Sequence, residues 1–228
     1  MIKKFMLPFI LKKYKMYLAI AAQSIALSLC PRHGKLFNYF RCFFTLKIVR
    51  SAGGTVNFTG SIDHDTDILI VNHQTMTDIF VLEEIIGNDA RFVGRKGIMD
   101  KWPVSRIVDL VGHITVDQQD KRAIIKLLRD IKVCKGKKVI IFPEGTRSQS
   151  GKIEAFEGGT KLIIEKLKLK AQPIVIKNIL SVYNESAKTA NSGVIEVEAL
   201  PAITLEDGWY EKTYQDMSRV FEQHNIKE

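Results

Sequence analysis

Short apolar runs recur along the chain from residue 53 onward, separated by longer stretches in which apolar residues follow a helical period. Runs of three to five residues bounded by polar residues or glycine are typical of strands that are buried on both faces of a sheet. The strands predicted from such runs and from apolar residues in shorter, mixed stretches are 55–58, 67–71, 91–93, 113–116, 138–142, 174–176 and 194–197.

The stretches between these runs predict helices. The clearest helix is 120–135, and a closing helix is predicted over 206–223. The apolar residues of the first recur on one helical face: Ile124, Leu127, Leu128 and Ile131. Strands that alternate with helices favour parallel pairing, because parallel neighbours need a crossover connection. The pattern therefore predicts a layered α/β sandwich with a largely parallel central sheet and helices on both faces.

Residues 1–52 have a different pattern. Lysines at positions 12, 13 and 15 interrupt an apolar stretch, and the apolar run 17–30 is shorter than the roughly 20 residues that span a bilayer as one helix. Residues 36–46 are dense in aromatic side chains and have basic neighbours. We interpret 1–52 as two short helices that lie in or dip into one membrane leaflet, a monotopic or peripheral attachment. The alternative is that these helices only pack on the core of a second unit, 53–228.

Composition narrows the choice of partners. The chain has 228 residues, 46% of them hydrophobic, and 34 basic against 25 acidic residues give a formal charge of +9. This size and apolar content suit one globular unit and exclude a disordered chain or a protein with several membrane spans. The positive charge favours anionic partners, such as an anionic membrane surface, a phosphorylated substrate or an acidic carrier protein. Nucleic acid is the competing interpretation, but no nucleic-acid-binding motif accompanies the charge.

The three cysteines indicate a reducing compartment. Cys30, Cys42 and Cys134 have neither metal-ligand nor redox spacing, as expected for a protein of the cytosol. A catalytic thiol is conceivable at Cys134, but its place on the apolar side of a predicted helix favours packing.

A histidine and an aspartate stand five residues apart directly after the predicted strand 67–71. Five residues of continuous helix advance about 500°, which would leave His73 and Asp78 on different faces. If His73 lies in the turn and Asp78 in the first turn of the next helix, the carboxylate can bond one imidazole nitrogen and raise the basicity of the other. The pair is therefore a candidate general base and its orienting acid.

A second polar cluster, 142–148, follows the predicted strand 138–142. Gly145 permits close approach of the backbone, Thr146 and Ser148 carry hydroxyls, and Arg147 offers a planar fork for phosphate oxygens. These residues predict an anion site.

His-x4-Asp followed by Phe-Pro-Glu-Gly-Thr-Arg-Ser about seventy residues later resembles one family closely. The chain is similar to the lysophosphatidic acid acyltransferases, or 1-acyl-glycerol-3-phosphate acyltransferases, of the bacterial membrane type, from about Gly60 to Pro201. The stretch 94–98 occupies the place of the family's acceptor-binding block. Three positions depart from the usual family pattern, Gln118, Gly97 and Glu157, and these concern the acceptor more than the reaction.

The resemblance implies an enzyme that moves a fatty acyl group from an acyl thioester to the sn-2 hydroxyl of lysophosphatidic acid, giving phosphatidic acid. His73 would be the general base and Asp78 its orienting acid. The predicted ligands of the acceptor phosphate are Arg147, Gly145, Thr146, Glu144, Arg95 and Lys96, with Glu144 either positioning the glycerol or bracing its loop. The donor would be an acyl-carrier-protein or coenzyme A thioester, with no cofactor and no metal, at the cytoplasmic face of the cell membrane.

Other interpretations remain open at this point. The acceptor could be another lysolipid, such as a lyso-aminolipid or a lysophospholipid, and a non-catalytic lipid-binding protein could retain the fold. A metal site would use His73, Asp78 and Glu144, but these separations match no standard zinc spacing. Gly158 and Gly159 suit either a phosphate-binding loop or the start of a helix.

Overall fold

The computed structural model describes residues 2–117, 119–120 and 122–225, and the side chains of 6–117, 119–120 and 122–223. Seven strands form one sheet in the order β1-β9-β6-β2-β5-β3-β4, and a separate hairpin pairs β7 with β8. The strands of the sheet are β1 (Gly54–Thr59), β2 (Ile68–Val71), β3 (Ala90–Arg95), β4 (Ile114–Val116), β5 (Lys138–Ile141), β6 (Ala171–Lys177) and β9 (Gly193–Ala199). The hairpin consists of β7 (Tyr183–Asn184) and β8 (Thr189–Ala190). All pairings in the sheet are parallel except that of β6 with β9.

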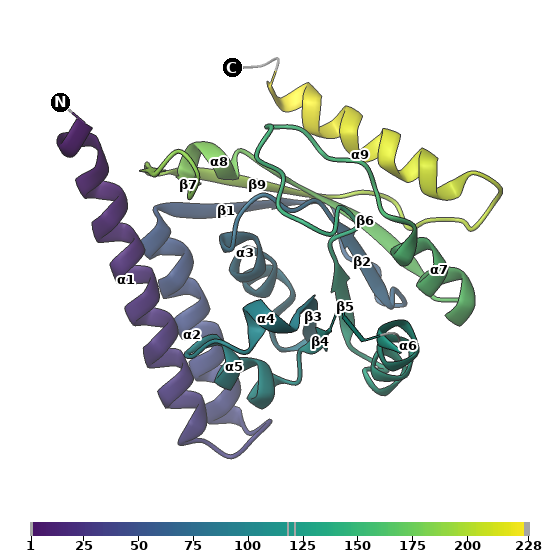
Figure 1. Cartoon of the computed structure of the whole chain (residues 1–228), viewed down its shortest axis with the longest axis horizontal. Helices are drawn as coiled ribbons and strands as arrows, with labels where there is room; N and C mark the ends of the chain where they lie inside the picture. Colours follow the sequence, from purple (N-terminus) through teal and green to yellow (C-terminus); the bar gives the residue numbers. More distant parts are fainter. Residues whose placement is uncertain (1, 118, 121, 226–228) are drawn as a thin grey trace.

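Helices cover both faces of this sheet (Figure 1). They are α1 (Ile2–Ser28), α2 (Lys35–Ala52), α3 (Thr77–Ile86), α4 (Lys96–Met99), α5 (Val104–Val111), α6 (Ala123–Val133), α7 (Gly158–Leu167), α8 (Ile179–Val182) and α9 (Trp209–Asn225), with a 3-10 turn at Gly87–Asp89. The predicted α/β sandwich with a largely parallel sheet is therefore confirmed.

Alternating side chains of the central strand β2 pack into two separate hydrophobic cores, one on each face of the sheet. Leu69 and Val71 point toward α1, α2, α3 and α5, whereas Ile68 and Ile70 point toward α6, α7 and α9. Because successive side chains of a strand face opposite sides of the sheet, a fully apolar strand needs apolar cover on both faces. The four residues of β2 are all completely buried.

The N-terminal pattern predicted two short helices, and this is wrong for the first. Helix α1 continues unbroken for 27 residues through the lysine cluster. Lysine is a good helix former, and the exposed Lys13 and Lys15 keep their charges in solvent without interrupting the backbone. Helix α2 then returns alongside α1 as an antiparallel hairpin (Figure 1).

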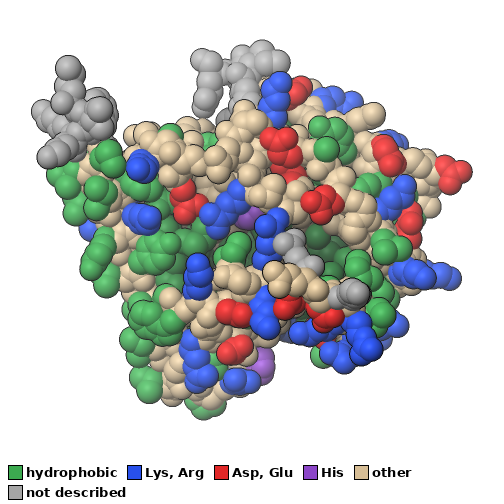
Figure 2. Space-filling model, viewed as in Figure 1, with side chains coloured by type: hydrophobic (Ala, Val, Ile, Leu, Met, Phe, Trp, Pro, Cys, Tyr) green, Lys and Arg blue, Asp and Glu red, His purple; other side chains and the backbone are tan. Residues whose placement is uncertain are grey.

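The helical hairpin of α1 and α2 has one face in the core and one face in solvent. Met16, Ile20 and Leu27 of α1 are buried in the same cluster as the sheet. The opposite face holds most of the exposed large hydrophobic side chains of the described residues: Leu7, Ile10, Leu11, Tyr14, Tyr17, Leu18, Ile25, Leu29, Leu36, Tyr39, Phe43 and Leu46. Figure 2 shows hydrophobic side chains gathered along the α1 side of the molecule, with basic side chains among them. Among the described residues, no helix combines the length and the apolar content needed to cross a membrane.

Candidate active site

The predicted site residues follow three neighbouring parallel strands. His73 comes after β2, Glu144 after β5, and Lys96 after β3. Since β5 pairs in parallel with both β2 and β3, the carboxyl ends of all three strands lie at one edge of the sheet. That edge is where open α/β sheets place their ligands.

His73 and Asp78 form a direct hydrogen bond. His73 Nδ1 lies 2.8 Å from Asp78 Oδ2, with Asp78 in the first turn of α3 and His73 in the loop before it. The side chain of Asp78 is 1% exposed and that of His73 is 14% exposed. The break between strand and helix that the five-residue spacing requires is therefore present, and it brings the pair together.

Asp78 is held as an acceptor by the loop around it. Its Oδ2 also accepts from the backbone N–H groups of Gln74 at 2.6 Å and Thr75 at 2.9 Å, and its Oδ1 accepts from the Thr75 hydroxyl. Because Oδ2 faces two obligatory donors, we assign the proton of the imidazole to Nδ1, which donates to it. No described residue is hydrogen-bonded to Nε2, whose lone pair is left to accept a proton.

Glu144 braces the loop that carries His73. Its Oε1 accepts from the His73 backbone N–H at 2.7 Å, and its Oε2 accepts from the Glu154 N–H at 2.8 Å. The residue is 3% exposed, and this burial raises the pKa of Glu144 from 4.5 to about 7, against the lowering effect of the two backbone hydrogen bonds. Of the two roles predicted for Glu144, the geometry supports bracing.

Three further contacts fix the His73 segment. The Ser148 N–H donates to the His73 carbonyl at 2.7 Å, and the Phe142 ring stacks on the imidazole with centroids 4.0 Å apart. The Asn72 side chain exchanges two hydrogen bonds with the backbone of Ile176 on β6, at 2.8 and 2.9 Å. These contacts fix the imidazole through its ring face, and they fix the backbone of His73 directly and through the preceding residue, Asn72.

The predicted phosphate ligands lie around the same loop, but they differ in their exposure and in whether another residue already bonds their side chains. Arg95 donates to the Gly145 carbonyl, and Gly145 has a φ of +65°, which favours glycine. Thr146 is exposed, and Lys96 lies 3.8 Å from Asp117 at the end of β4. Arg147 is already engaged in an ion pair of 2.7 Å with Glu185 of the hairpin.

Other residues of the predicted motifs hold the structure of their own segments instead of facing the site. Ser148 is buried, and its hydroxyl donates to the Lys152 carbonyl instead of facing solvent. Gly158 and Gly159 begin α7, which is the helix-start alternative. Gln118 lies outside the described residues. Within the described part of the chain, no group of three or more His, Cys, Asp or Glu side chains is placed to hold a metal ion.

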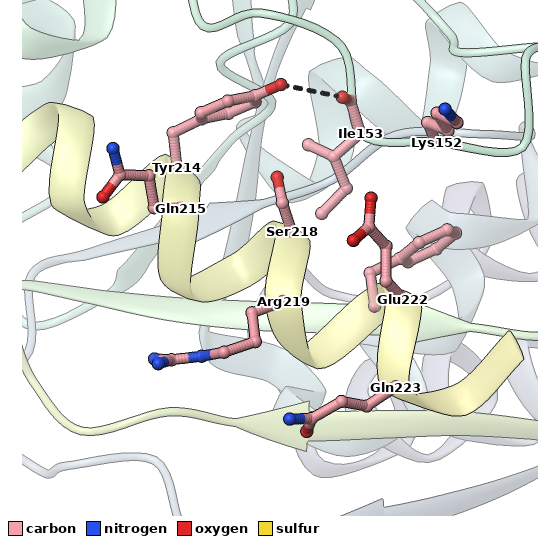
Figure 3. Close-up of a pocket in the computed structure, with 9 residues that line it drawn as sticks. Lys152, Ile153, Tyr214, Gln215, Ser218, Arg219, Glu222 and Gln223 are labelled. Atoms are coloured by element: carbon pink, nitrogen blue, oxygen red, sulfur yellow. Dashed lines mark hydrogen bonds between the residues drawn. The ribbon is translucent and has the colours of Figure 1, made fainter. Parts of the chain in front are cut away.

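A separate cavity of about 370 Å³ lies between α9 and residues 152–153. Figure 3 shows Ser218 and Glu222 of α9 facing Ile153, while Tyr214 bonds the Ile153 carbonyl. None of the predicted site residues lines this cavity.

A model of the acyltransferase family matches residues 55–177, more than half of the chain. The chain belongs to the acyltransferase family. The matched range contains His73, Asp78 and the loop 142–148.

Several relatives have related names. The chain is 29% identical over 212 residues to a 1-acyl-sn-glycerol-3-phosphate acyltransferase of Helicobacter pylori, covering 83% of this chain and 86% of that protein. It is 27% identical over 139 residues to the human 1-acyl-sn-glycerol-3-phosphate acyltransferase beta, covering 60% of this chain and 50% of the human protein.

The fold is also shared with a solved acyltransferase structure. The crystal structure of a 1-acyl-sn-glycerophosphate acyltransferase from Thermotoga maritima matches 97% of this chain and 96% of its own, with a TM-score of 0.80 and 17% identity. At that identity, the match establishes a common fold that includes both N-terminal helices.

Sequence reasoning missed Asn72, Phe142 as a partner of the imidazole, and Glu185. Asn72 directly precedes His73 and Phe142 begins the predicted cluster 142–148, so the position of both residues at strand ends was an available signal. Glu185 had none, because it lies 38 residues from Arg147 in an irregular segment.

Proposed function

We propose that this protein is a 1-acyl-sn-glycerol-3-phosphate acyltransferase, which moves a fatty acyl group from a thioester to the sn-2 hydroxyl of lysophosphatidic acid. The observation that carries the proposal is the His73–Asp78 pair, with Nδ1 bonded to a buried carboxylate and Nε2 without a described partner. A protein that only binds lipids has no need of this arrangement. The names of the relatives support the choice of acceptor.

In the proposed reaction, His73 Nε2 removes the proton of the acceptor hydroxyl as its oxygen attacks the thioester carbonyl. The tetrahedral intermediate then collapses, the C–S bond breaks, and the imidazolium returns the proton to the departing thiolate. Asp78 stabilises the imidazolium and keeps its orientation, as the acid does in a serine hydrolase triad. The substrate supplies the hydroxyl, so no covalent enzyme intermediate forms.

The acceptor phosphate would lie against the loop 142–148. Arg147 provides a planar, permanently charged fork, and Arg95 and Lys96 add positive charge from the end of the neighbouring strand. The donor, either an acyl-carrier-protein or a coenzyme A thioester, would approach from the aqueous side.

We further propose that the exposed apolar face of α1 and α2 rests on the cytoplasmic face of a membrane. A contiguous apolar surface of this kind normally marks a partner or a lipid interface. Lysines such as Lys13 and Lys15 border this face, where each adds about 1 kcal/mol near anionic headgroups. The acceptor is itself a lipid, so this placement lets its tail stay in hydrocarbon while its headgroup reaches His73.

The test is to identify the products by mass spectrometry. The purified protein is given a panel of lysolipids that includes lysophosphatidic acid, lysophosphatidylethanolamine and a lyso-aminolipid, with each thioester donor in turn. We expect phosphatidic acid to form fastest. If another lysolipid is acylated faster, that lysolipid is the acceptor instead of lysophosphatidic acid. If no lysolipid in the panel is acylated, the proposed activity is refuted.

A further inference from the structure

Arg147 and Glu185 form a half-buried ion pair beside the proposed acceptor site. Arg147 Nη1 donates to Glu185 Oε2 at 2.7 Å, and the two side chains are 32% and 28% exposed. The contact joins the loop after β5 to the turn between β7 and β8, two segments that are distant in the sequence.

The pair uses only one corner of the guanidinium. Nη1 faces Glu185, and no described residue bonds Nε or Nη2, which together form the side-on edge of the fork. This edge presents two parallel N–H groups with the spacing of two oxygens of a phosphate or carboxylate. Glu185 therefore orients the guanidinium without occupying the edge that suits an anion.

The turn that carries Glu185 is held by hydrogen bonds of its own and by the strand that precedes it. Asn184 Oδ1 accepts from the backbone N–H groups of Ser186 at 3.0 Å and Ala187 at 2.8 Å. Tyr183 is completely buried, and its ring stacks on Phe9 of α1 with centroids 5.4 Å apart. A carboxylate held on such a turn can fix a long side chain that would otherwise sample many rotamers.

We propose that Glu185 is a positioning residue for the acceptor, which holds Arg147 so that its Nε–Nη2 edge binds the acceptor phosphate in a bidentate way. The inference rests on the proposed function, because it assumes a phosphorylated acceptor at Arg147. It also assigns a role to the hairpin of β7 and β8, which lies outside the residues matched by the family model.

The test separates orientation from charge by comparing two substitutions. Glu185→Ala removes the acceptor oxygen that holds Nη1, whereas Glu185→Gln keeps an oxygen there and removes only the charge. Without Glu185, the substrate itself must immobilise the long Arg147 side chain, which lowers the affinity for the acceptor by up to about tenfold. We expect Glu185→Ala to raise the KM for lysophosphatidic acid about tenfold and to leave the KM of the thioester donor unchanged. Glu185→Gln should stay within about twofold of the unmodified protein.

A double-mutant cycle identifies the route of the effect. In an Arg147→Lys background the fork is gone, so adding Glu185→Ala should not raise the acceptor KM further. Asp89→Ala is the control, because it breaks the 2.6 Å pair with Lys137, and these two residues precede β3 and β5 at the edge of the sheet opposite the site. This control should leave both KM values unchanged.

Two results would overturn the inference. If both Glu185 variants lower the acceptor KM, the carboxylate competes with the phosphate instead of orienting Arg147. If Glu185→Ala folds and leaves the acceptor KM unchanged, Glu185 has no role in binding. Failure of the proposed function is separate, because it would appear as absence of lysophosphatidic acid acylation in the unmodified protein.

Discussion

Glu144 shows how one buried carboxyl group connects the two halves of the site. Its oxygens bond the backbone N–H groups of His73 and Glu154, so it joins the loop after β2 to the loop after β5. The sequence predicted that Glu144 lies near His73, and the structure places it in contact with the His73 backbone, but the sequence could not distinguish a ligand from a brace. Burial and hydrogen-bond partners decide this, and both depend on the packing of loops that local patterns do not specify.

The first prediction concerns the pH dependence that Glu144 imposes on stability. Its pKa is raised from 4.5 in the unfolded chain to about 7 in the fold, so the native state holds a proton that the unfolded state has released. The contribution is therefore fully present below pH 4.5 and is lost as pH rises to about 7, a change of roughly 3 kcal/mol.

Glu144→Gln removes this titration. It also leaves one backbone N–H facing an amide NH₂, which costs about 1–3 kcal/mol. Urea unfolding at pH 4.5 and pH 8 measures the difference in free energy of unfolding between the unmodified protein and the variant. The titration of all other groups is common to both proteins and cancels in this difference. We expect the variant's stability deficit to shrink as pH rises, and a deficit independent of pH would contradict the assigned shift.

At the scale of elements, the buried pair of Arg41 and Glu83 fixes the helical hairpin to the domain. Their side chains are 3% and 4% exposed, and they join α2 to α3, the helix that begins beside His73. Arg41 also donates to the carbonyls of Asn88 and Ala90, and Thr45 donates to Glu83 at 2.8 Å. The orientation of α2 is therefore set by polar contacts as well as by apolar packing.

The second prediction follows from this burial. Glu83→Ala leaves the Arg41 charge buried without its partner and should lower the free energy of unfolding by about 3–5 kcal/mol. Replacing both residues, as Arg41→Met with Glu83→Leu, should recover most of the loss. Asp89→Ala breaks the exposed pair with Lys137 and should cost at most about 1 kcal/mol. Chemical denaturation measures all three, and equal effects of Glu83→Ala and Asp89→Ala would contradict the role of the buried pair.

Local pattern predicted the seven strands of the sheet, most of them as short apolar runs with polar ends, whereas β1 alternates Val56 and Phe58 with polar residues. It did not predict the two-residue strands β7 and β8, whose sequence has no apolar run, or the full length of α1. The apolar face of α6 was only partly correct, because Leu127 and Ile131 are buried whereas Ile124 is 39% exposed. Burial of a helical residue depends on which element covers it, and that information lies far away in the chain.

At the scale of the whole molecule, the packing of α1 and α2 bears on the two interpretations of residues 1–52, which are core packing and membrane attachment. One face is core, since Met16, Ile20, Ile48 and Val49 are completely buried. Removing residues 1–52 would therefore expose the apolar residues of the sheet and of α3 that α1 and α2 cover, and we expect it to prevent folding. Membrane association must be tested on the exposed face instead.

The third prediction uses a single charge on that face. Leu18 is 59% exposed on α1, so Leu18→Glu should leave the stability unchanged within about 0.5 kcal/mol. The same change should reduce cosedimentation with phosphatidylglycerol vesicles, because it places an anion at an anionic, apolar interface. Leu205→Glu, at a residue 44% exposed outside the hairpin, is the control and should bind vesicles normally. Equal binding by both variants would mean that this face is not the membrane surface.

The pairing of distant residues marks the limit of prediction from this sequence. His73 and Asp78 are five residues apart, and a turn between strand and helix was enough to predict their contact. Arg147 and Glu185 are 38 residues apart and Arg41 and Glu83 are 42 apart, so each pair meets only through the packing of separate elements around a sheet whose strand order is not sequential. That order cannot be read from the spacing of apolar residues.

The most direct test of the central claim is the single-turnover rate of lysophosphatidic acid acylation by His73→Ala, with Asp78→Asn measured beside it. Removing a positioned general base costs about 10²–10⁴-fold in rate, and Asp78→Asn should cost less because it misorients the base without deleting it. Circular dichroism and vesicle binding should be unchanged in both variants. A His73→Ala protein that is correctly folded and acylates lysophosphatidic acid at close to the unmodified rate would contradict the proposed mechanism.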